Sequence, residues 1–388
     1  MLNLIRPLGD RLAQGWQAQS AVERARAFGA ATKPWLRDGV AELLARVGAT
    51  SPQRFARGAL TIVTFHRVLP ADLRSHYPLQ GLALTPEQLE QVLCELAPHF
   101  ECSSVIEAYR RWRKNGVRPP RPLLGLSFDD GALDNYEHAR PVLDKLGLHA
   151  SFYVPVRNVR ERRALWHDRL GFALLRSVAA VRKAGDVDFD GLLSPFGLSE
   201  SSFAAVLPDD ALRLAAQGVA AARRLPPEPR QRALEALEAA LGGDQVPAFA
   251  GLMSADQLRE LHRAGHEIGS QSLTHPLRSG ASEASVREEV EASRRELAEL
   301  IGAPVASSCH PDGDSEGRVL QAVQAAGYEC AVTTRWGLNR KESTAFELAR
   351  CDMDFARLRS RHGGFSKERL WLRLSGLQPG LARSAGPG

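Results

Sequence analysis

Short runs of apolar and β-branched residues recur along the chain from about residue 60 onward. Each run is four to six residues long, and stretches with helical periodicity lie between them. Runs of this length and composition are typical of buried strands in a parallel sheet. The predicted strands are Leu60–Phe65, Leu123–Phe128, Ala150–Val154, Glu267–Ser270, Val305–Cys309 and Cys330–Thr334. The alternation of strand and helix predicts an α/β sheet or barrel with right-handed crossovers.

Several helices have recognisable starts. Thr85 precedes Pro86, so an N-cap threonine is followed by proline at the first helical position. Ser254 and Gln257 have the spacing of a capping box. Ser282 opens a long helical run that we expect to stop at Gly302.

One stretch interrupts the alternation. Residues 157–250 contain no convincing strand; they begin with an arginine-dense segment and continue as alanine- and leucine-rich helices separated by glycine and proline. We therefore predict a helical insertion between two core strands. It could cover an active site, bind a partner or enlarge the core, and the sequence does not choose among these roles. Residues 379–388 are rich in Gly, Pro, Ser and Ala, which predicts a flexible tail.

The first 58 residues carry an excess of positive charge. Nine Lys or Arg stand against four Asp or Glu, an excess of +5 that equals the net charge of the whole chain. Apolar residues recur there at roughly helical spacing: Leu2, Leu4, Ile5, Leu8, Leu12 and Trp16. This pattern predicts an N-terminal helical extension over residues 1–58. Such a helix could rest on an anionic membrane or a partner, or it could pack on the protein's own surface.

Composition excludes some classes of protein. Hydrophobic residues make up 44% and charged residues 24% of the 388 residues, which is ordinary for a globular chain. The mild net charge and the lack of nucleic-acid-binding motifs argue against a nucleic acid partner. Five scattered cysteines without a C-x-x-C pair argue against a disulfide framework or a cysteine zinc site. No segment approaches the roughly 18 apolar residues of a membrane span, so we expect a cytoplasmic protein whose membrane contact, if any, is peripheral.

The most informative run places two carboxylates at the end of a strand. Asp129 and Asp130 follow the predicted strand Leu123–Phe128 and precede Gly131. Active sites of parallel α/β proteins gather at the carboxyl ends of strands. Neighbouring aspartates repel each other, and a cation that neutralises one of them would leave the other available as a general base. The alternative is that one aspartate caps a helix and the other interacts with its dipole.

A second run puts further polar side chains at a strand end. The strand that ends at Ser270 delivers Gln271 and His275, which are four residues apart and could face one point if the chain continues as a helical turn. A lone histidine is more often structural than a ligand. His275 stands out because it shares the predicted strand-end rim with Asp129 and Asp130.

An ordered set of segments resembles the polysaccharide deacetylase family (carbohydrate esterase family 4), in a branch with Tyr-His-Arg in its opening strand. The matching segments are Thr64–Val68, Leu126–Gly131 with Asp134–Tyr136, Ala150–Val154, Gly265–Pro276, Cys309–Asp314 and Phe346–Arg350. Each segment alone is a weak signal, but their common order is specific. The resemblance covers roughly residues 60–156 and 250–375.

The resemblance implies a fold and an activity. The fold would be a distorted (β/α)7-type barrel with six or seven strands over residues 59–378. The activity would be hydrolysis of carbon–nitrogen bonds other than peptide bonds, by removal of N-acetyl, or less often O-acetyl, groups from a saccharide in surface-polysaccharide or glycolipid metabolism. By the family's pattern Asp129 would be the general base, while Asp130 and His275 would bind zinc or a similar cation such as cobalt or manganese. The metal would polarise the acetyl carbonyl and a bound water.

Two positions depart from the family's pattern. Gln271 stands where the family has its first metal histidine; its amide oxygen can coordinate a cation but is a weaker zinc ligand than imidazole. No Leu-x-Leu-His segment near the C-terminus supplies the usual general-acid histidine. His66 and His310, both at predicted strand ends, are the substitutes we consider, with His66 preferred. Because of these departures, a non-catalytic carbohydrate-binding relative is the alternative function.

Overall fold

A parallel sheet forms the centre of the molecule. The computed structural model describes residues 35–114, 119–183, 187–204, 207–274, 282–313, 315 and 317–378. The main sheet runs in the order β10-β1-β5-β6-β7-β8-β9, and β4 pairs with β5 beside this path. The strands are β1 Leu60–Phe65, β4 Glu101–Ser104, β5 Leu123–Phe128, β6 Ser151–Val154, β7 Glu267–Ser270, β8 Ser307–Cys309, β9 Cys330–Val332 and β10 Cys351–Asp352. A separate short pair joins β2 Arg67–Val68 to β3 Ala83–Leu84. Each of the six predicted strands is present, within two residues of its predicted limits.

The sheet curls into the distorted barrel that the sequence predicts, because the segment after β9 returns to β1. Leu348 forms a parallel bridge to Val332 in β9, and Cys351 then pairs with Val63 in β1. The segment between Leu348 and Asp352 thus links the last strand of the path to the first. This closure brings Arg350, which lies between the two pairings, across the interior of the barrel.

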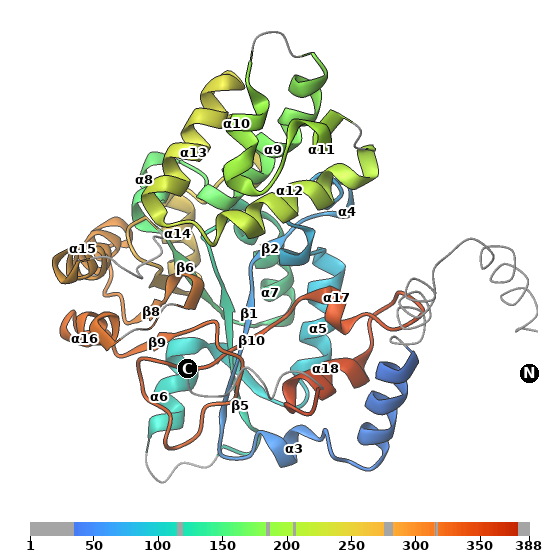
Figure 1. Cartoon of the computed structure of the whole chain (residues 1–388). Helices are drawn as coiled ribbons and strands as arrows, with labels where there is room; N and C mark the ends of the chain where they lie inside the picture. Colours follow the sequence, from blue (N-terminus) through green and yellow to red (C-terminus); the bar gives the residue numbers. More distant parts are fainter. Residues whose placement is uncertain are drawn as a thin grey trace, which may run out of the picture.

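Helices cover the outside of the sheet. They are α3 Pro52–Phe55, α4 Ala71–Arg74, α5 Pro86–Leu96, α6 Val105–Arg113, α7 Arg140–Leu146, α14 Ala255–Arg263, α15 Glu283–Ile301, α16 Gly317–Ala325, α17 Phe355–Leu358 and α18 Lys367–Leu374. The predicted starts are confirmed: Thr85 and Ser254 each form a capping box, and Ser282 caps α15. Gly302 ends α15 in the left-handed conformation. Figure 1 shows α15 and α16 on one flank of the sheet and α5 and α18 on the other.

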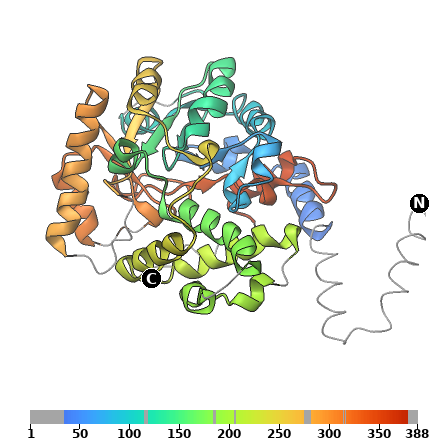
Figure 2. The same ribbon diagram turned by 90° about the horizontal axis from the view of Figure 1, so that it is seen from above.

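After β6 the chain forms α8 Val156–Glu161, whose Val156 and Val159 pack in the cluster under the sheet. The helices that follow have a core of their own. They are α9 Trp166–Arg182, α10 Phe189–Leu193, α11 Glu200–Ala204, α12 Pro208–Ala222 and α13 Pro227–Ala240. Leu170, Phe196, Phe203 and Leu234 belong to one buried apolar cluster, separate from the cluster under the sheet. Figures 1 and 2 show α9 to α13 gathered together beyond one end of the barrel. The exact limits of this insertion and of the other predicted domains stay predictions.

The N-terminal extension is described only from residue 35. Residues 35–46 form a helix, and the predicted apolar positions from Leu2 to Trp16 lie outside the described residues. Asp38, on the buried side of this helix, pairs with Arg369 of α18 and ties the helix to the barrel. No helix in the described part of the chain is long and apolar enough to span a membrane.

A buried arginine holds the insertion on the barrel. Arg67, in β2, is ion-paired with Asp134, which follows β5, and with Asp168 in α9. It also donates to the carbonyl of Phe249, at the far end of the insertion, at 3.2 Å. Tyr77 donates to the second carboxylate oxygen of Asp168 at 2.7 Å. Although burial lowers the pKa of Arg67, the carboxylates of Asp134 and Asp168 raise it above its ordinary value, so the side chain stays charged.

The ion pairs of Arg67 predict a large contribution of this residue to the free energy of unfolding. Arg67→Met would leave two buried carboxylates without their cation, and removing one partner of a buried ion pair costs about 3–5 kcal/mol. We expect a loss of this size in the free energy of unfolding, measured by urea denaturation. Arg110→Met is the matched control, because Arg110 and Glu329 form an ion pair with half-exposed side chains and should contribute under about 1 kcal/mol. Equal losses for the two variants would contradict the anchoring role of Arg67.

Candidate active site at the carboxyl ends of the strands

Asp129 is clamped by an arginine from the barrel's closing segment. Both side chains are buried, and the Nη1 and Nη2 atoms of Arg350 donate to Oδ1 and Oδ2 of Asp129, each at 2.7 Å. A bidentate guanidinium–carboxylate pair is strong and fixes the orientation of the carboxylate plane. The same guanidinium donates to Thr64 of β1 and Ser127 of β5. The Asp129 carboxylate therefore contacts a fixed cation in the barrel interior rather than a helix N-terminus.

Asp130 occupies a different environment one residue later. Its Oδ1 accepts a hydrogen bond from Nε2 of Gln271 at 3.0 Å, and its backbone N–H donates to Oε1 of the same amide at 2.8 Å. The structure therefore brings together two of the predicted metal-ligating residues, from the ends of β5 and β7. The two neighbouring aspartates therefore have different hydrogen-bond partners: the charged guanidinium of Arg350 for Asp129 and the neutral amide of Gln271 for Asp130.

The backbone beside these residues is strained. Asp130 has a φ of 73° and Ser272, which follows Gln271, has a φ of 70°. Left-handed backbone in non-glycine residues is uncommon and costs of the order of 1–3 kcal/mol, and such residues cluster at functional sites. Gly131 is also left-handed, and a Cβ there would lie 3.0 Å from Val154. The turn after β5 is thus built to present the Asp130 side chain at the rim.

The predicted catalytic histidine lies beside Asp129. His66 follows β1 directly, and its Nε2 atom is 4.0 Å from Oδ2 of Asp129. Its side chain is 24% exposed, so it can meet a ligand from solvent, whereas Asp129 is only 2% exposed. The backbone of His66 is held in place, because its carbonyl accepts a hydrogen bond from the Asn135 side chain at 2.8 Å.

Two other predicted histidines have different outcomes. His275 lies outside the described residues, so its approach to Asp130 stays a prediction. His310 is buried, and its Nε2 atom is 2.9 Å from the carbonyl oxygen of Phe346. This contact joins the loop after β8 to the segment that leads into the barrel closure.

Two residues of the site were not predicted from the sequence. Arg350 had no predicted role, although it ends the segment Phe346–Arg350 that resembles the deacetylase family. His167 is a 5% exposed residue of α9 whose Nε2 atom is 3.7 Å from Oδ2 of Asp130. Spacing along the chain could not show this contact, because His167 belongs to the insertion.

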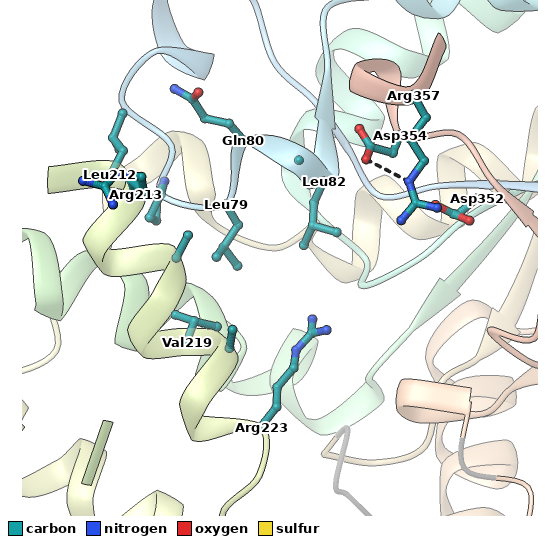
Figure 3. Close-up of a pocket in the computed structure, with 14 residues that line it drawn as sticks. Leu79, Gln80, Leu82, Leu212, Arg213, Val219, Arg223, Asp352, Asp354 and Arg357 are labelled. Atoms are coloured by element: carbon teal, nitrogen blue, oxygen red, sulfur yellow. Dashed lines mark ion pairs between the residues drawn. The ribbon is translucent and has the colours of Figure 1, made fainter. Parts of the chain in front are cut away.

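A groove lies between the insertion and the rim of the barrel. It has a cavity volume of about 560 Å³ and is lined by Leu79 and Leu82, by Val219 of α12 and Arg223 at its end, and by Asp352, Asp354 and Arg357. Asp352 lies two residues after Arg350 in the chain, but the residues that line the groove do not include Asp129, Asp130 or the residues that contact them. Figure 3 shows Arg223 and the Arg357–Asp354 ion pair facing it from opposite sides. A cavity of this size suits a small ligand such as a sugar unit.

Part of the chain matches a known protein family. The family model described as polysaccharide deacetylase matches residues 232–331, the part of the chain that holds β7, Gln271, β8 and β9. Over these residues the chain is similar to the polysaccharide deacetylase family. No curated protein matches the chain.

A solved deacetylase shares its fold. A Streptococcus pyogenes deacetylase, PplD in complex with acetate, is 16% identical, covers 81% of this chain and 98% of its own, and superposes with a TM-score of 0.52. IcaB from Ammonifex degensii is 15% identical, covers 82% of this chain and 95% of its own, and has a TM-score of 0.48. At such low identity, the likeness to the Streptococcus pyogenes protein shows a shared fold and nothing finer.

Polysaccharide deacetylases use a divalent metal ion, and the described residues fit one in part. Among the residues that the structure describes, no three His, Cys, Asp or Glu side chains form a set that could hold a metal. Asp130 and Gln271, however, are in contact, and both carry oxygen atoms that divalent cations accept as ligands. The donor set is therefore compatible with the family's metal, but at position 271 it offers an amide instead of an imidazole.

Cys309 also contacts the clamp but is unsuited to be a nucleophile. Its Sγ atom lies 3.2 Å from Nη2 of Arg350 and 3.7 Å from Oδ2 of Asp129. Burial raises the pKa of the Cys309 thiol well above its ordinary value, with Arg350 opposing this and Asp129 adding to it. The thiolate is the reactive form of cysteine, so Cys309 is held in its unreactive form.

Thiol labelling tests this assignment. In the native protein at pH 8 we expect one fast reaction with a disulfide reagent, at the exposed Cys94, and no fast reaction at Cys309. The absorbance of the released thiolate counts the reacted groups, and a Cys94→Ser variant should lose the fast phase. Rapid native-state modification of Cys309, located by mass spectrometry, would show that the thiol is accessible and ionised.

Proposed function

We propose that the protein is a metal-dependent deacetylase that removes an N-acetyl, or alternatively an O-acetyl, group from a saccharide in surface-polysaccharide or glycolipid metabolism. The observation that carries the proposal is the pair of adjacent aspartates with different partners, Asp129 on a guanidinium and Asp130 on an amide. The match of residues 232–331 to the polysaccharide deacetylase family model supports it. Acetate, which is bound in the Streptococcus pyogenes deacetylase, would be the released product.

The roles of the residues follow from their surroundings. Asp129, held in one orientation by Arg350, takes the proton of the attacking water as general base. The water oxygen forms the new bond to the acetyl carbon, and the bond from that carbon to the sugar nitrogen breaks. His66, which is partly exposed 4.0 Å from Asp129, donates a proton to the leaving nitrogen. The products are acetate and a free amino sugar.

The cation would be held at Asp130. Asp130 and His275, with Gln271 as a neutral oxygen ligand, would bind zinc, or cobalt or manganese in its place. When bound, such an ion supplies Lewis-acid polarisation of the acetyl carbonyl and of water. Gln271 also orients the Asp130 carboxylate through its two hydrogen bonds. The groove between α12 and the barrel would take a neighbouring unit of the saccharide.

Conservative variants distinguish the proposed roles of the two aspartates. Asp129→Asn removes the base, so we expect acetate release from acetylated amino-sugar oligomers to fall about 10²- to 10⁴-fold, while metal affinity changes little. Asp130→Asn keeps a residue that tolerates positive φ but removes the charge on the cation site, so both metal binding and activity should be lost. Acetate release with a panel of Zn²⁺, Co²⁺ and Mn²⁺ and calorimetric titration of the same ions measure the two effects.

Asp256→Asn is the control for these variants, because Asp256 is exposed on α14 and pairs only with the neighbouring Arg259 among the contacts described for it. It should leave both acetate release and metal affinity unchanged. Thermal unfolding checks that each variant is folded. Full activity of Asp129→Asn would remove the general base from the mechanism and with it the proposed hydrolysis.

One observation favours a second function, a carbohydrate-binding protein without catalysis. The Gln271 amide makes two hydrogen bonds to Asp130 where the family has a metal histidine, and these bonds can stabilise the carboxylate without a cation. The titrations above decide between the functions. Saccharide binding without any affinity for the three ions would support the binding protein, whereas ion binding that depends on Asp130 supports the enzyme.

We also propose that the protein is cytoplasmic and touches an anionic membrane through residues 1–58. Leu36, Leu43 and Val47 lie on one face of the helix at residues 35–46 and its end, and they are 60–70% exposed. Exposed Arg37 and Arg46 lie on the same helix, and the net charge of +5 in residues 1–58 is complementary to anionic lipid.

Vesicle sedimentation tests this contact. The full chain should sediment with phosphatidylglycerol-containing vesicles and not with pure phosphatidylcholine. Replacing Leu36, Leu43 and Val47 together by serine should weaken binding at least about fivefold, because three apolar side chains lose their insertion. Serine at Val187, Leu207 and Leu377, which are exposed elsewhere, is the matched control. Equal binding by both triple variants would exclude this helix face as the contact.

A further inference from the structure

The helical insertion places a histidine directly over the candidate metal site. His167 is the second residue of α9, and its imidazole Nε2 atom lies 3.7 Å from Oδ2 of Asp130. Gln271 approaches the other carboxylate oxygen, Oδ1, at 3.0 Å. One carboxylate oxygen of Asp130 therefore contacts the amide of Gln271 at the end of β7. The other oxygen faces the imidazole of His167, which belongs to the insertion.

The neighbours of His167 hold it in this position. On one side Asp168 is ion-paired with Arg67 and accepts a hydrogen bond from Tyr77. On the other side Trp166 packs under the guanidinium of Arg230, with 4.0 Å from its central carbon to the ring centroid. These contacts fix the first turn of α9 on the barrel, so the imidazole is placed by buried interactions rather than by a surface loop.

The chemistry of the donors favours an imidazole at this point. Gln271 uses its amide oxygen to accept the Asp130 N–H and its amide nitrogen to hold the Asp130 side chain, which leaves it poorly suited to supply a strong bond to zinc. Imidazole is the common nitrogen ligand of zinc, at about 2.0–2.1 Å. Two ligand atoms at such distances in a tetrahedral site lie roughly 3.3 Å apart, and the separation of 3.7 Å between His167 and Asp130 is close to this.

We propose that His167 is a ligand of the divalent cation, so that the insertion supplies the imidazole missing at position 271. The inference rests on the proposed metal-dependent function. It gives the insertion a place inside the active site, and it makes Arg67 and Asp168 positioning residues for a metal ligand. The site would then hold the cation through Asp130 and His167.

Metal binding by the full chain tests the assignment. Calorimetric titration with Zn²⁺ and Co²⁺ should show at least about tenfold weaker binding for His167→Ala than for the parent. His167→Gln, which keeps size and polarity, should show a similar loss and carries the test if the alanine variant does not fold. His262→Ala, on α14 and away from the rim, is the matched control and should bind as the parent does. The visible absorption of bound Co²⁺ should also change on loss of His167, because the spectrum reports the ligand set.

A second pair of variants tests whether His167 stands in for the histidine missing at position 271. In a Gln271→His background the strand end supplies its own imidazole, so His167→Ala should weaken zinc binding by no more than about threefold. The two single variants and the double variant form a cycle that measures this coupling. If His167→Ala weakens zinc binding as much in that background as in the parent, His167 does not take the place of the histidine missing at position 271.

The outcomes distinguish this inference from the proposed function. Ion binding that is abolished by Asp130→Asn but unchanged by His167→Ala and His167→Gln would overturn the role of His167 and leave the deacetylase proposal standing. A parent protein that binds none of the ions would overturn the metal-dependent function itself. Binding that requires both residues supports both proposals.

Discussion

The ion pair between Arg350 and Asp129 joins the closure of the barrel to the chemistry of its rim. Arg350 lies between the residue that bridges to β9 and the residue that pairs with β1, so its position is determined by the closure of the sheet. The buried guanidinium would be costly to desolvate without a carboxylate partner. Asp129 meets this need, and it also raises the pKa of Arg350 above its ordinary value although burial alone would lower it. The residue proposed as base is thus held by the same contact that completes the fold.

Arg67 is a second buried arginine that joins two parts of the structure, here the barrel and the insertion. It neutralises Asp134 on the barrel and Asp168 on the insertion, and it bonds the carbonyl of Phe249 where the chain returns. Burial raises the pKa of Asp134, and the adjacent guanidinium opposes that rise. One buried cation therefore fixes both ends of a helical group of roughly ninety residues to the rim. The position of His167 near Asp130 therefore depends on the ion pairs of Arg67.

Much of the barrel could be predicted from the sequence because its strands are apolar runs bounded by caps and glycine. Leu60–Phe65 and Leu123–Phe128 are fully buried, so their composition alone identifies them. Glu101–Ser104 was missed because it is short and three of its four residues are polar; it pairs with only part of β5. Cys351–Asp352 was missed because two residues carry no periodic signal.

The candidate site was predictable only where its residues follow strands. Asp129, Asp130, His66 and Gln271 meet because parallel strands end at one rim, as the sequence pattern indicates. The contact of His167 with Asp130 depends on how helices of the insertion pack, which no local pattern encodes. The bonding of Gln271 to Asp130 was likewise hidden, since an amide's partners depend on rotamer and backbone. His275 stays a prediction.

The separate apolar cluster of the insertion has an evolutionary consequence. Because Leu170, Phe196, Phe203 and Leu234 pack against one another and not under the sheet, substitutions among them perturb the helical group without loosening the barrel. The two parts meet through the Arg67 ion pairs and through a small apolar cluster in which Phe172 of α9 packs with Leu69 and Tyr77. Exchange of the other helices is compatible with both contacts as long as the first two turns of α9 are kept. Lineages of this family could therefore replace the helical group and change ion preference or substrate entry, while the barrel drifts under different selective pressure.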